Sequence, residues 1–316
     1  MNKQHAPKIL AIGRSRFLFD SIEYLLSRGF DIQGIVTAEA YEEYDIKAQD
    51  FENLARRAGI PCLIVNDVLD DRIISLIREQ RIQIGISVNW KYKLPKSFLD
   101  RFPCGILNFH LGSLPDYKGN ATVNWAILNG EDHIYANVHR MEAELDAGDV
   151  LARERIPITQ ESYVADIIKQ AEMILPKLYE SAIDTALTKP DYAVVRGSTA
   201  GLRCYPRAPE DGQIDWKDSV EQAHRMVRAS SRPYAGAFSF LNGKKVIIWR
   251  AEKVVPENAY LALPGQIVDF DKDRKTVSVA CRDGFLVLQE IELDGEVICP
   301  SDQIKSIRTR FQYLGS

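Results

Sequence analysis

Short apolar runs alternate with amphipathic stretches over the first 90 residues of the chain. The apolar runs have the length of β-strands and lie at 8–12, 32–37, 62–65 and 82–88. Between them, apolar residues recur with helical spacing over 17–28, 47–58 and 70–80. Gly29 and Gly59 follow the first two of these stretches and are typical helix stops. Strands that alternate with helices of this length predict βαβ units and a parallel sheet of the α/β class.

The next stretch, 105–149, combines the same apolar pattern with polar residues that carry chemistry. A predicted strand contains Asn108 and His110, and residues two apart on a strand point to the same side. A loop, a short helix over 121–128 and a strand over 135–141 follow, and the stretch closes with Asp146 and Asp149 in a glycine-containing turn. An amide, an imidazole and a carboxylate at one rim of a sheet suit an acyl transfer. Each residue taken alone is more often a cap or a turn residue than a catalyst.

The second half of the chain changes character twice. Residues 162–188 show a long helical pattern that Pro176 is expected to kink or split. Glycine and proline are then frequent up to Gly212, which predicts a connection. Beyond it, a helix over 219–229 precedes short alternating runs at 237–241, 245–250, 265–269, 276–280 and 285–290, and Asn242-Gly243 is a favourable hairpin turn. We therefore predict an N-terminal domain (1–190), a linker (191–212) and a small antiparallel OB-like barrel (213–316).

Composition and charge narrow the class of protein. A length of 316 residues suits two domains, and 46% hydrophobic with 27% charged residues is ordinary for a globular protein. The formal charge of −4 and the nearly balanced charge of the C-terminal part do not favour nucleic acid or an anionic membrane as partner. No apolar run is long enough to span a membrane, and the polar N-terminus predicts no signal peptide.

The five cysteines are scattered and contain no C-x-x-C, so we expect reduced thiols in a cytoplasmic protein, without a metal site. After the first predicted strand, Gly13-Arg14-Ser15 does not match the dinucleotide fingerprint G-x-G-x-x-G, which disfavours a dehydrogenase. Arg14 or Arg16 is a candidate for holding a phosphate of another ligand, and a solvated arginine is the alternative.

Several segments, in order, resemble the folate-dependent formyltransferases. They are Asn108-Phe109-His110, Gly112-Ser113-Leu114-Pro115, Tyr117-Lys118-Gly119, Asn124-Trp125-Ala126 and Leu145-Asp146-Ala147-Gly148. The family pattern is N-x-H, then S-L-L-P, then an aspartate in L-D-x-G; here Gly-Ser-Leu-Pro replaces S-L-L-P and shifts the serine by one position. Further similarity over 204–238 extends to the linker and second domain of methionyl-tRNA formyltransferases and aminoarabinose-type formyltransferases. The closer overall similarity is to the latter, through Asn124-Trp125, Asn129-Gly130-Glu131 and His139-Arg140-Met141.

The resemblance implies a Rossmann-like domain followed by an OB-type domain, and it implies site residues. Asn108, His110 and Asp146 would be catalytic, with Asp149 the less favoured carboxylate. The donor would be 10-formyltetrahydrofolate, held by Tyr92, Lys93, Leu94, Ser113, Leu114, Pro115, Asn120, Glu142, Ala143, Glu144 and Leu145. Asn108 would donate to the oxyanion, while His110 would be a second donor or the base. Asp146 would either orient His110 or hold a water.

The charge of the chain indicates which class of molecule supplies the amine that accepts the formyl group. Docking of tRNA needs a basic surface, whereas a nucleotide-linked amino sugar needs a pocket, phosphate contacts and a ring for stacking. We favour the amino sugar, which implies modification of a surface polysaccharide or lipid such as O-antigen or lipopolysaccharide. The alternatives are methionyl-tRNA formyl transfer and a non-catalytic sugar-nucleotide binding module. Candidate substrate ligands are Arg14, Trp90, Lys118 and Trp125. The oligomeric state stays open, with a homodimer as one candidate.

Overall fold

The computed structural model describes residues 7–40 and 44–313. The N-terminal residues 1–6, on which the expectation about a signal peptide partly rests, lie outside these ranges. The described chain forms two compact units. The first contains residues up to 122, 133–157 and 168–204, and the second contains 123–132, 158–167 and 205–316. The predicted division at 190 and 213 follows the order of the chain and stays a prediction.

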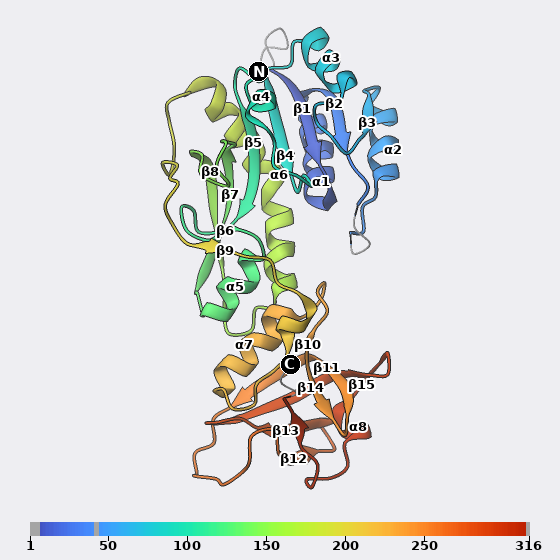
Figure 1. The fold of residues 1–316 in the computed structure, drawn as a ribbon, viewed down its shortest axis with the longest axis vertical. Helices are drawn as coiled ribbons and strands as arrows, with labels where there is room; N and C mark the ends of the chain where they lie inside the picture. The colour runs from blue at the N-terminus through green and yellow to red at the C-terminus, as the bar shows by residue number, and fades with distance from the viewer. Residues whose placement is uncertain (1–6, 41–43, 314–316) are drawn as a thin grey trace. The chain divides into compact units, whose positions relative to one another are not determined.

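The first unit is built on one seven-stranded sheet, whose strand order is β3-β2-β1-β4-β5-β7-β8 (Figure 1). Its strands are β1 (Lys8–Gly13), β2 (Asp31–Thr37), β3 (Cys62–Ile64), β4 (Ile84–Val88), β5 (Ile106–Leu111), β7 (His133–Arg140) and β8 (Val150–Pro157). The first five strands pair in parallel, and β7 and β8 extend the sheet in antiparallel pairs. The predicted Rossmann-like parallel sheet is confirmed.

The helices along the chain from the first βαβ unit onward are α1 (Ser15–Ser27), α2 (Ala48–Ala58), α3 (Asp71–Gln80), α4 (Lys96–Leu99), α5 (Thr122–Asn129) and α6 (Val164–Thr188). The glycine stop after α2 is confirmed, because Gly59 takes the left-handed conformation with φ 68°. Pro176 lies inside α6, which is one helix from end to end and is not split. The strand β8 and the short helix α4 lie outside the elements that the apolar pattern predicted.

The parallel strands need their apolar residues on both faces of the sheet, and they have them. Every residue of β4 is buried, and so are the last five of β1. On one face, Leu10, Val36 and Ile106 belong to a core cluster with Phe98 of α4 and Phe102. This core fixes the strands that carry the polar residues described below.

The second unit contains a curled antiparallel sheet, as expected for an OB-like domain. Its strands run in the order β12-β13-β14-β11-β10-β16, with β15 on β14. They are β10 (Ala237–Leu241), β11 (Lys244–Val254), β12 (Ile267–Asp271), β13 (Thr276–Ala280), β14 (Phe285–Leu293), β15 (Glu296–Ile298) and β16 (Phe311–Gln312), accompanied by α7 (Val220–Ser230) and α8 (Pro300–Gln303). Leu241 pairs with Lys244, and both Asn242 and Gly243 have positive φ, so the predicted two-residue hairpin is confirmed.

Three further short elements complete the chain, namely β6 (Lys118–Gly119), β9 (Arg203–Cys204) and the 3-10 helix η2 (Pro209–Gly212). The pairing of β6 with β9 brings residues 203–204 beside the loop that follows β5. Within the described residues, no helix has the length and apolar character needed to cross a membrane.

Candidate active site

The register of three adjacent strands gathers polar side chains on one face of the sheet. In β5, Asn108 lies opposite Ser87 of the parallel strand β4 and opposite His139 of the antiparallel strand β7. His110 lies opposite Asn137. Residues that face each other across neighbouring strands project to the same side, as do residues two apart in one strand. The two predicted residues of β5 therefore share a face with two residues of β7.

Asp146 reaches this group from the turn that joins β7 to β8. Its own φ is 48°, in the left-handed region, and its Oδ2 accepts a hydrogen bond of 2.9 Å from the Gly119 amide. Gly148 makes the turn possible, because a Cβ at that position would lie 1.9 Å from the Arg140 carbonyl oxygen. The glycine of the L-D-x-G pattern is thus needed for a close approach of two backbone segments.

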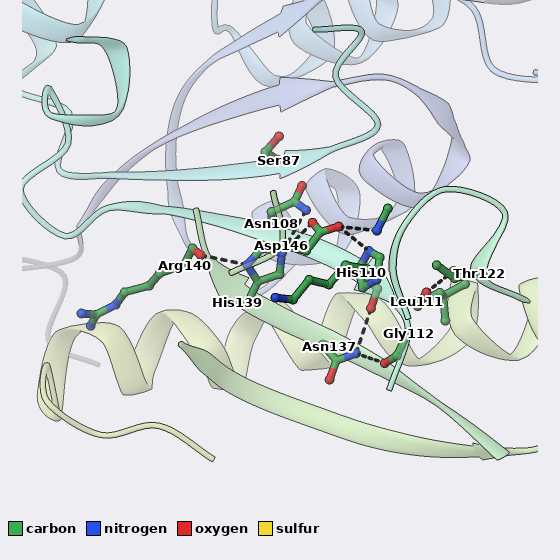
Figure 2. Close-up of polar contacts among 12 residues, drawn as sticks. Ser87, Asn108, His110, Leu111, Gly112, Thr122, Asn137, His139, Arg140 and Asp146 are labelled. Carbon is green, nitrogen blue, oxygen red and sulfur yellow. Dashed lines mark hydrogen bonds and ion pairs between the residues drawn. The ribbon is translucent and has the colours of Figure 1, made fainter. Parts of the chain in front are cut away.

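The three predicted catalytic side chains meet, and a fourth side chain joins them (Figure 2). Asp146 Oδ2 lies 3.5 Å from His110 Nδ1, and Asp146 Oδ1 lies 3.5 Å from His139 Nε2. Asn108 Nδ2 lies 3.2 Å from the same His139 nitrogen. The carboxylate of Asp146 therefore stands between two imidazoles, and the amide of Asn108 contacts one of them.

The hydrogen bond of His110 to the backbone defines its tautomer. His110 Nε2 lies 2.7 Å from the carbonyl oxygen of Tyr117, which only accepts, so this nitrogen carries the proton. In the neutral ring, Nδ1 then presents its lone pair toward Asp146. Gly112 leaves room for the contact, since a Cβ there would lie 2.3 Å from His110 Nε2 and 2.4 Å from the Tyr117 oxygen.

Burial and charge set the ionisation of the two partners in opposite ways. Burial lowers the pKa of His110 below its usual 6.5, and the attraction of Asp146 only partly offsets this. Burial alone would raise the pKa of Asp146. At the acidic pH where Asp146 titrates, however, the imidazoles are protonated. Their positive charge and the Gly119 N–H outweigh burial and lower the pKa of Asp146. At neutral pH the pair is a neutral imidazole beside an ionised carboxylate.

This arrangement is organised to receive a proton. Both imidazoles donate to backbone carbonyls, His110 to Tyr117 and His139 to Arg140, so their other nitrogens face Asp146 as acceptors. A proton delivered to His110 Nδ1 would lie directly beside a negative charge. The amide of Asn108, half-buried on the same face, is a hydrogen-bond donor for a developing oxyanion. Donor, base and carboxylate are the components of an acyl transfer without a covalent enzyme intermediate.

The residues predicted to hold the folate differ widely in exposure. Leu94 and Leu114 are buried, Ser113 and Pro115 are half-buried, and the others are exposed, namely Tyr92, Lys93, Asn120, Glu142, Ala143, Glu144 and Leu145. Glu142 and Ala143 line a cavity of about 590 Å³ near the amino end of β5. Its wall also contains Leu99, Phe102 and Met141.

Of the four predicted substrate ligands, the two cationic residues hold backbone carbonyls. Arg14 is buried, and its guanidinium donates to the carbonyls of Asn89 and Glu39. Lys118 is also buried and donates to the carbonyls of Ser198 and Ala200.

The two tryptophans have different settings. Trp90 is half-buried against the core of the first unit. Trp125 belongs to the second unit, where its indole N–H donates to the Tyr205 carbonyl and the guanidinium of Arg207 lies 5.5 Å from its ring centre. Their assignment to the substrate stays a prediction.

His139 contacts the predicted catalytic residues but was not itself predicted from the sequence as a site residue. It lies 31 positions after Asn108, and only the antiparallel register of β5 and β7 places the two side by side. The signal available in the sequence was its position in the strand just before Arg140-Met141, within a segment that carries the resemblance. In the described part of the chain, no three or more His, Cys, Asp or Glu residues are arranged to hold a metal ion.

An amide, an imidazole and a carboxylate that meet on one face of a Rossmann-like sheet suit a group transfer. Comparison with known families makes this specific. The model of the formyl transferase domain matches residues 21–183, and that of the formyl transferase C-terminal domain matches residues 207–307. The chain belongs to the formyl transferase family.

Three solved structures with the same fold are the following. HypX from Aquifex aeolicus in complex with tetrahydrofolic acid is 18% identical with a TM-score of 0.61, over 96% of this chain and 48% of HypX, so the chain spans about half of that protein. An N-formyltransferase from Helicobacter canadensis, in complex with folinic acid and dTDP-3-aminofucose, is 16% identical with a TM-score of 0.68, over 90% of this chain and 100% of that one. Methionyl-tRNA formyltransferase from Clostridium thermocellum is 16% identical with a TM-score of 0.54, over 78% and 93%.

Proposed function

We propose that the protein transfers the formyl group of 10-formyltetrahydrofolate to the amino group of a nucleotide-linked amino sugar. The observation that carries the proposal is the convergence of Asn108, His110 and Asp146 in a chain of the formyl transferase family. The amine attacks the formyl carbon, and the carbonyl oxygen becomes negative in the tetrahedral intermediate. Asn108 donates to this oxygen, and His110 Nδ1 takes the proton that the amine loses. When the intermediate collapses, the bond between the formyl carbon and N10 breaks and this proton passes to N10, which leaves the formamide and tetrahydrofolate. Asp146 stabilises the resulting imidazolium.

The cavity near the amino end of β5 supports the donor. Its wall combines apolar residues such as Leu99, Phe102 and Met141 with polar ones, among them Lys96 and Arg140, which suits a flat heterocycle with polar edges. The buried side-chain Nε of Arg140 has no hydrogen-bond partner among the described residues, and a shift of this side chain would bring it to a ring oxygen or nitrogen. Gly105 of the cavity is three residues before Asn108, about 10 Å along a strand. A donor whose ring occupies the cavity would extend its formyl group toward Asn108.

The charge of the protein and the full-length similarity support an amino sugar as acceptor. A formal charge of −4 gives no general attraction for tRNA. The structure of the Helicobacter canadensis enzyme, whose whole length aligns with this chain, contains a dTDP-linked amino sugar. An amino sugar supplies an amine, and the neutral His110 can take the proton that this amine loses.

The test is incubation of the protein with 10-formyltetrahydrofolate and a panel of 3- and 4-amino sugars linked to dTDP, UDP or GDP. Charged initiator tRNA serves as the competing acceptor. A mass gain of one formyl group on a sugar nucleotide is the expected result. Formylation of the tRNA alone would replace the proposed acceptor. Binding of the sugar nucleotide with no transfer to either acceptor would favour a binding module.

Asn108→Ala is the matched test of the chemistry. Loss of one oxyanion donor is expected to lower kcat by about 100- to 1000-fold. Folate binding, followed by titration calorimetry, is expected to stay unchanged because Asn108 stabilises the charge that the carbonyl oxygen acquires only in the intermediate. A variant with near-normal kcat would remove Asn108 from the mechanism.

A further inference from the structure

We infer that His139 is a positioning residue that fixes the direction of the Asn108 amide. The inference rests on the proposed formyl transfer, since the orientation of the amide matters only if it donates to an oxyanion. His139 projects from β7 and is 2% exposed. It is not one of the three residues that the family pattern identifies.

The tautomer of His139 follows from its backbone contact. Its Nδ1 lies 2.8 Å from the carbonyl oxygen of Arg140, and a carbonyl oxygen only accepts, so Nδ1 carries a proton. The carbonyl is itself held in place, because the Arg140 amide donates to Asp149 and Gly148 lies directly behind the oxygen. The ring is thus fixed at one nitrogen by rigid backbone.

The other nitrogen has two neighbours, and their distances differ. Asn108 Nδ2 lies 3.2 Å from His139 Nε2, within the usual range for a hydrogen bond, whereas Asp146 Oδ1 lies 3.5 Å away, beyond it. The amide is therefore the hydrogen-bond partner. An amide NH₂ only donates, so Nε2 is the acceptor in this contact.

This contact decides which end of the Asn108 amide faces the imidazole. One N–H of the amide is used by His139, and the NH₂ group has a second N–H that remains for a ligand. If the acceptor were lost, the amide could rotate and present its oxygen instead. An oxygen in that place would repel the developing oxyanion rather than stabilise it. His139 thereby acts on the reaction through Asn108.

Two substitutions separate the two hydrogen bonds of His139. In H139Q, the side-chain oxygen can take the place of Nε2 and keep an acceptor for Asn108. In H139N, the shorter amide can keep the donor to Arg140 but has no group at the place of Nε2. A merely structural role would make both variants equally harmful or would favour H139N, which keeps the contact with the backbone.

The expected effects are on kcat rather than KM. We expect H139N to lower kcat by about 10- to 100-fold, part of the cost of losing the donor entirely, with the KM values for both substrates changed less than about threefold. H139Q is expected to stay within about fivefold of the wild type. In the N108A background, H139N is expected to add less than about twofold, since coupled residues are not additive.

Each outcome bears on the inference separately from the proposed function. Equal kcat for H139N and wild type, or a full additional loss in the N108A background, would overturn the positioning role. So would a ¹⁵N NMR spectrum of ring-labelled protein showing His139 protonated at Nε2 rather than at Nδ1, whereas the Nδ1–H tautomer supports it. The spectrum needs no substrate. If the wild type formylates no sugar nucleotide, the proposed function fails while the spectrum still decides the state of His139.

Discussion

Replacing Asp146 with asparagine removes one negative charge from the site and keeps the size of the side chain. The carboxylate is 7% exposed, and its Oδ2 lies 3.5 Å from His110 Nδ1. When His110 takes the proton of the amine, a positive ring forms at that distance from the charge. With an effective dielectric constant of about 20, the attraction is about 5 kcal/mol. Because each 1.36 kcal/mol in the barrier is tenfold in rate, the charge can account for about a 5000-fold effect on kcat.

We therefore expect D146N to lower kcat by about 5000-fold, within the range of about 100- to 10000-fold that is typical of acid–base groups. The assay is single-turnover formyl transfer at pH 7.5, where His110 is neutral in both proteins because burial holds its pKa below 6.5. A thermal melt of the variant shows whether the fold is retained.

The matched control is D149N, the same change three residues further along the turn. Asp149 pairs with Arg196 at 2.9 Å and accepts from the Gly197 amide at 2.7 Å. These contacts are with the Arg196 guanidinium and the Gly197 backbone and not with the imidazoles, so kcat is expected to stay within about threefold. A loss of less than tenfold in D146N, or an equal loss in D149N, would refute the assignment of the carboxylate.

Three further changes test the surroundings of the site. Gly112→Ala places a methyl group 2.3 Å from His110 Nε2. Such overpacking is expected to lower the stability by about 1–3 kcal/mol and to lower kcat, as measured by thermal melts and turnover. An unchanged melting temperature and rate would contradict the close contact. Because the pKa of His110 is lowered, kcat is expected to fall on the acidic side only below pH 6.5, where the base becomes protonated. A pH–rate profile in which kcat already falls above pH 6.5 would contradict a neutral His110 as the base. The same shift predicts that His110 costs stability as pH falls below 6.5, because the unfolded chain binds the proton first; urea titrations at pH 7.5 and 5.5, compared with those of the His110→Asn variant, measure it.

The sequence predicted many of the helices and strands because the apolar periodicity of each depends only on residues close together in the chain. Alternating apolar runs at 8–12 and 82–88 predicted strands that the structure has at Lys8–Gly13 and Ile84–Val88. Asn242-Gly243 predicted its hairpin because both positions take positive φ, which few residue types tolerate. Pro176 was a less reliable signal, since α6 continues through it. The strand β8 was not predicted; its exposed Glu154 and Arg155 interrupt the alternation.

By itself the sequence determined that Asn108 and His110 point to one side of a strand, since a two-residue spacing on a strand requires no other part of the chain. It also determined, through the ordered segments, that the chain is similar to formyl transferases. Only the tertiary structure decided that His139 lies against Asn108 and that Asp146 stands between two imidazoles. The physical reason is that antiparallel register and a turn held by close backbone contacts are set by pairing between distant segments, and a shift of one residue would turn His139 to the other face of the sheet.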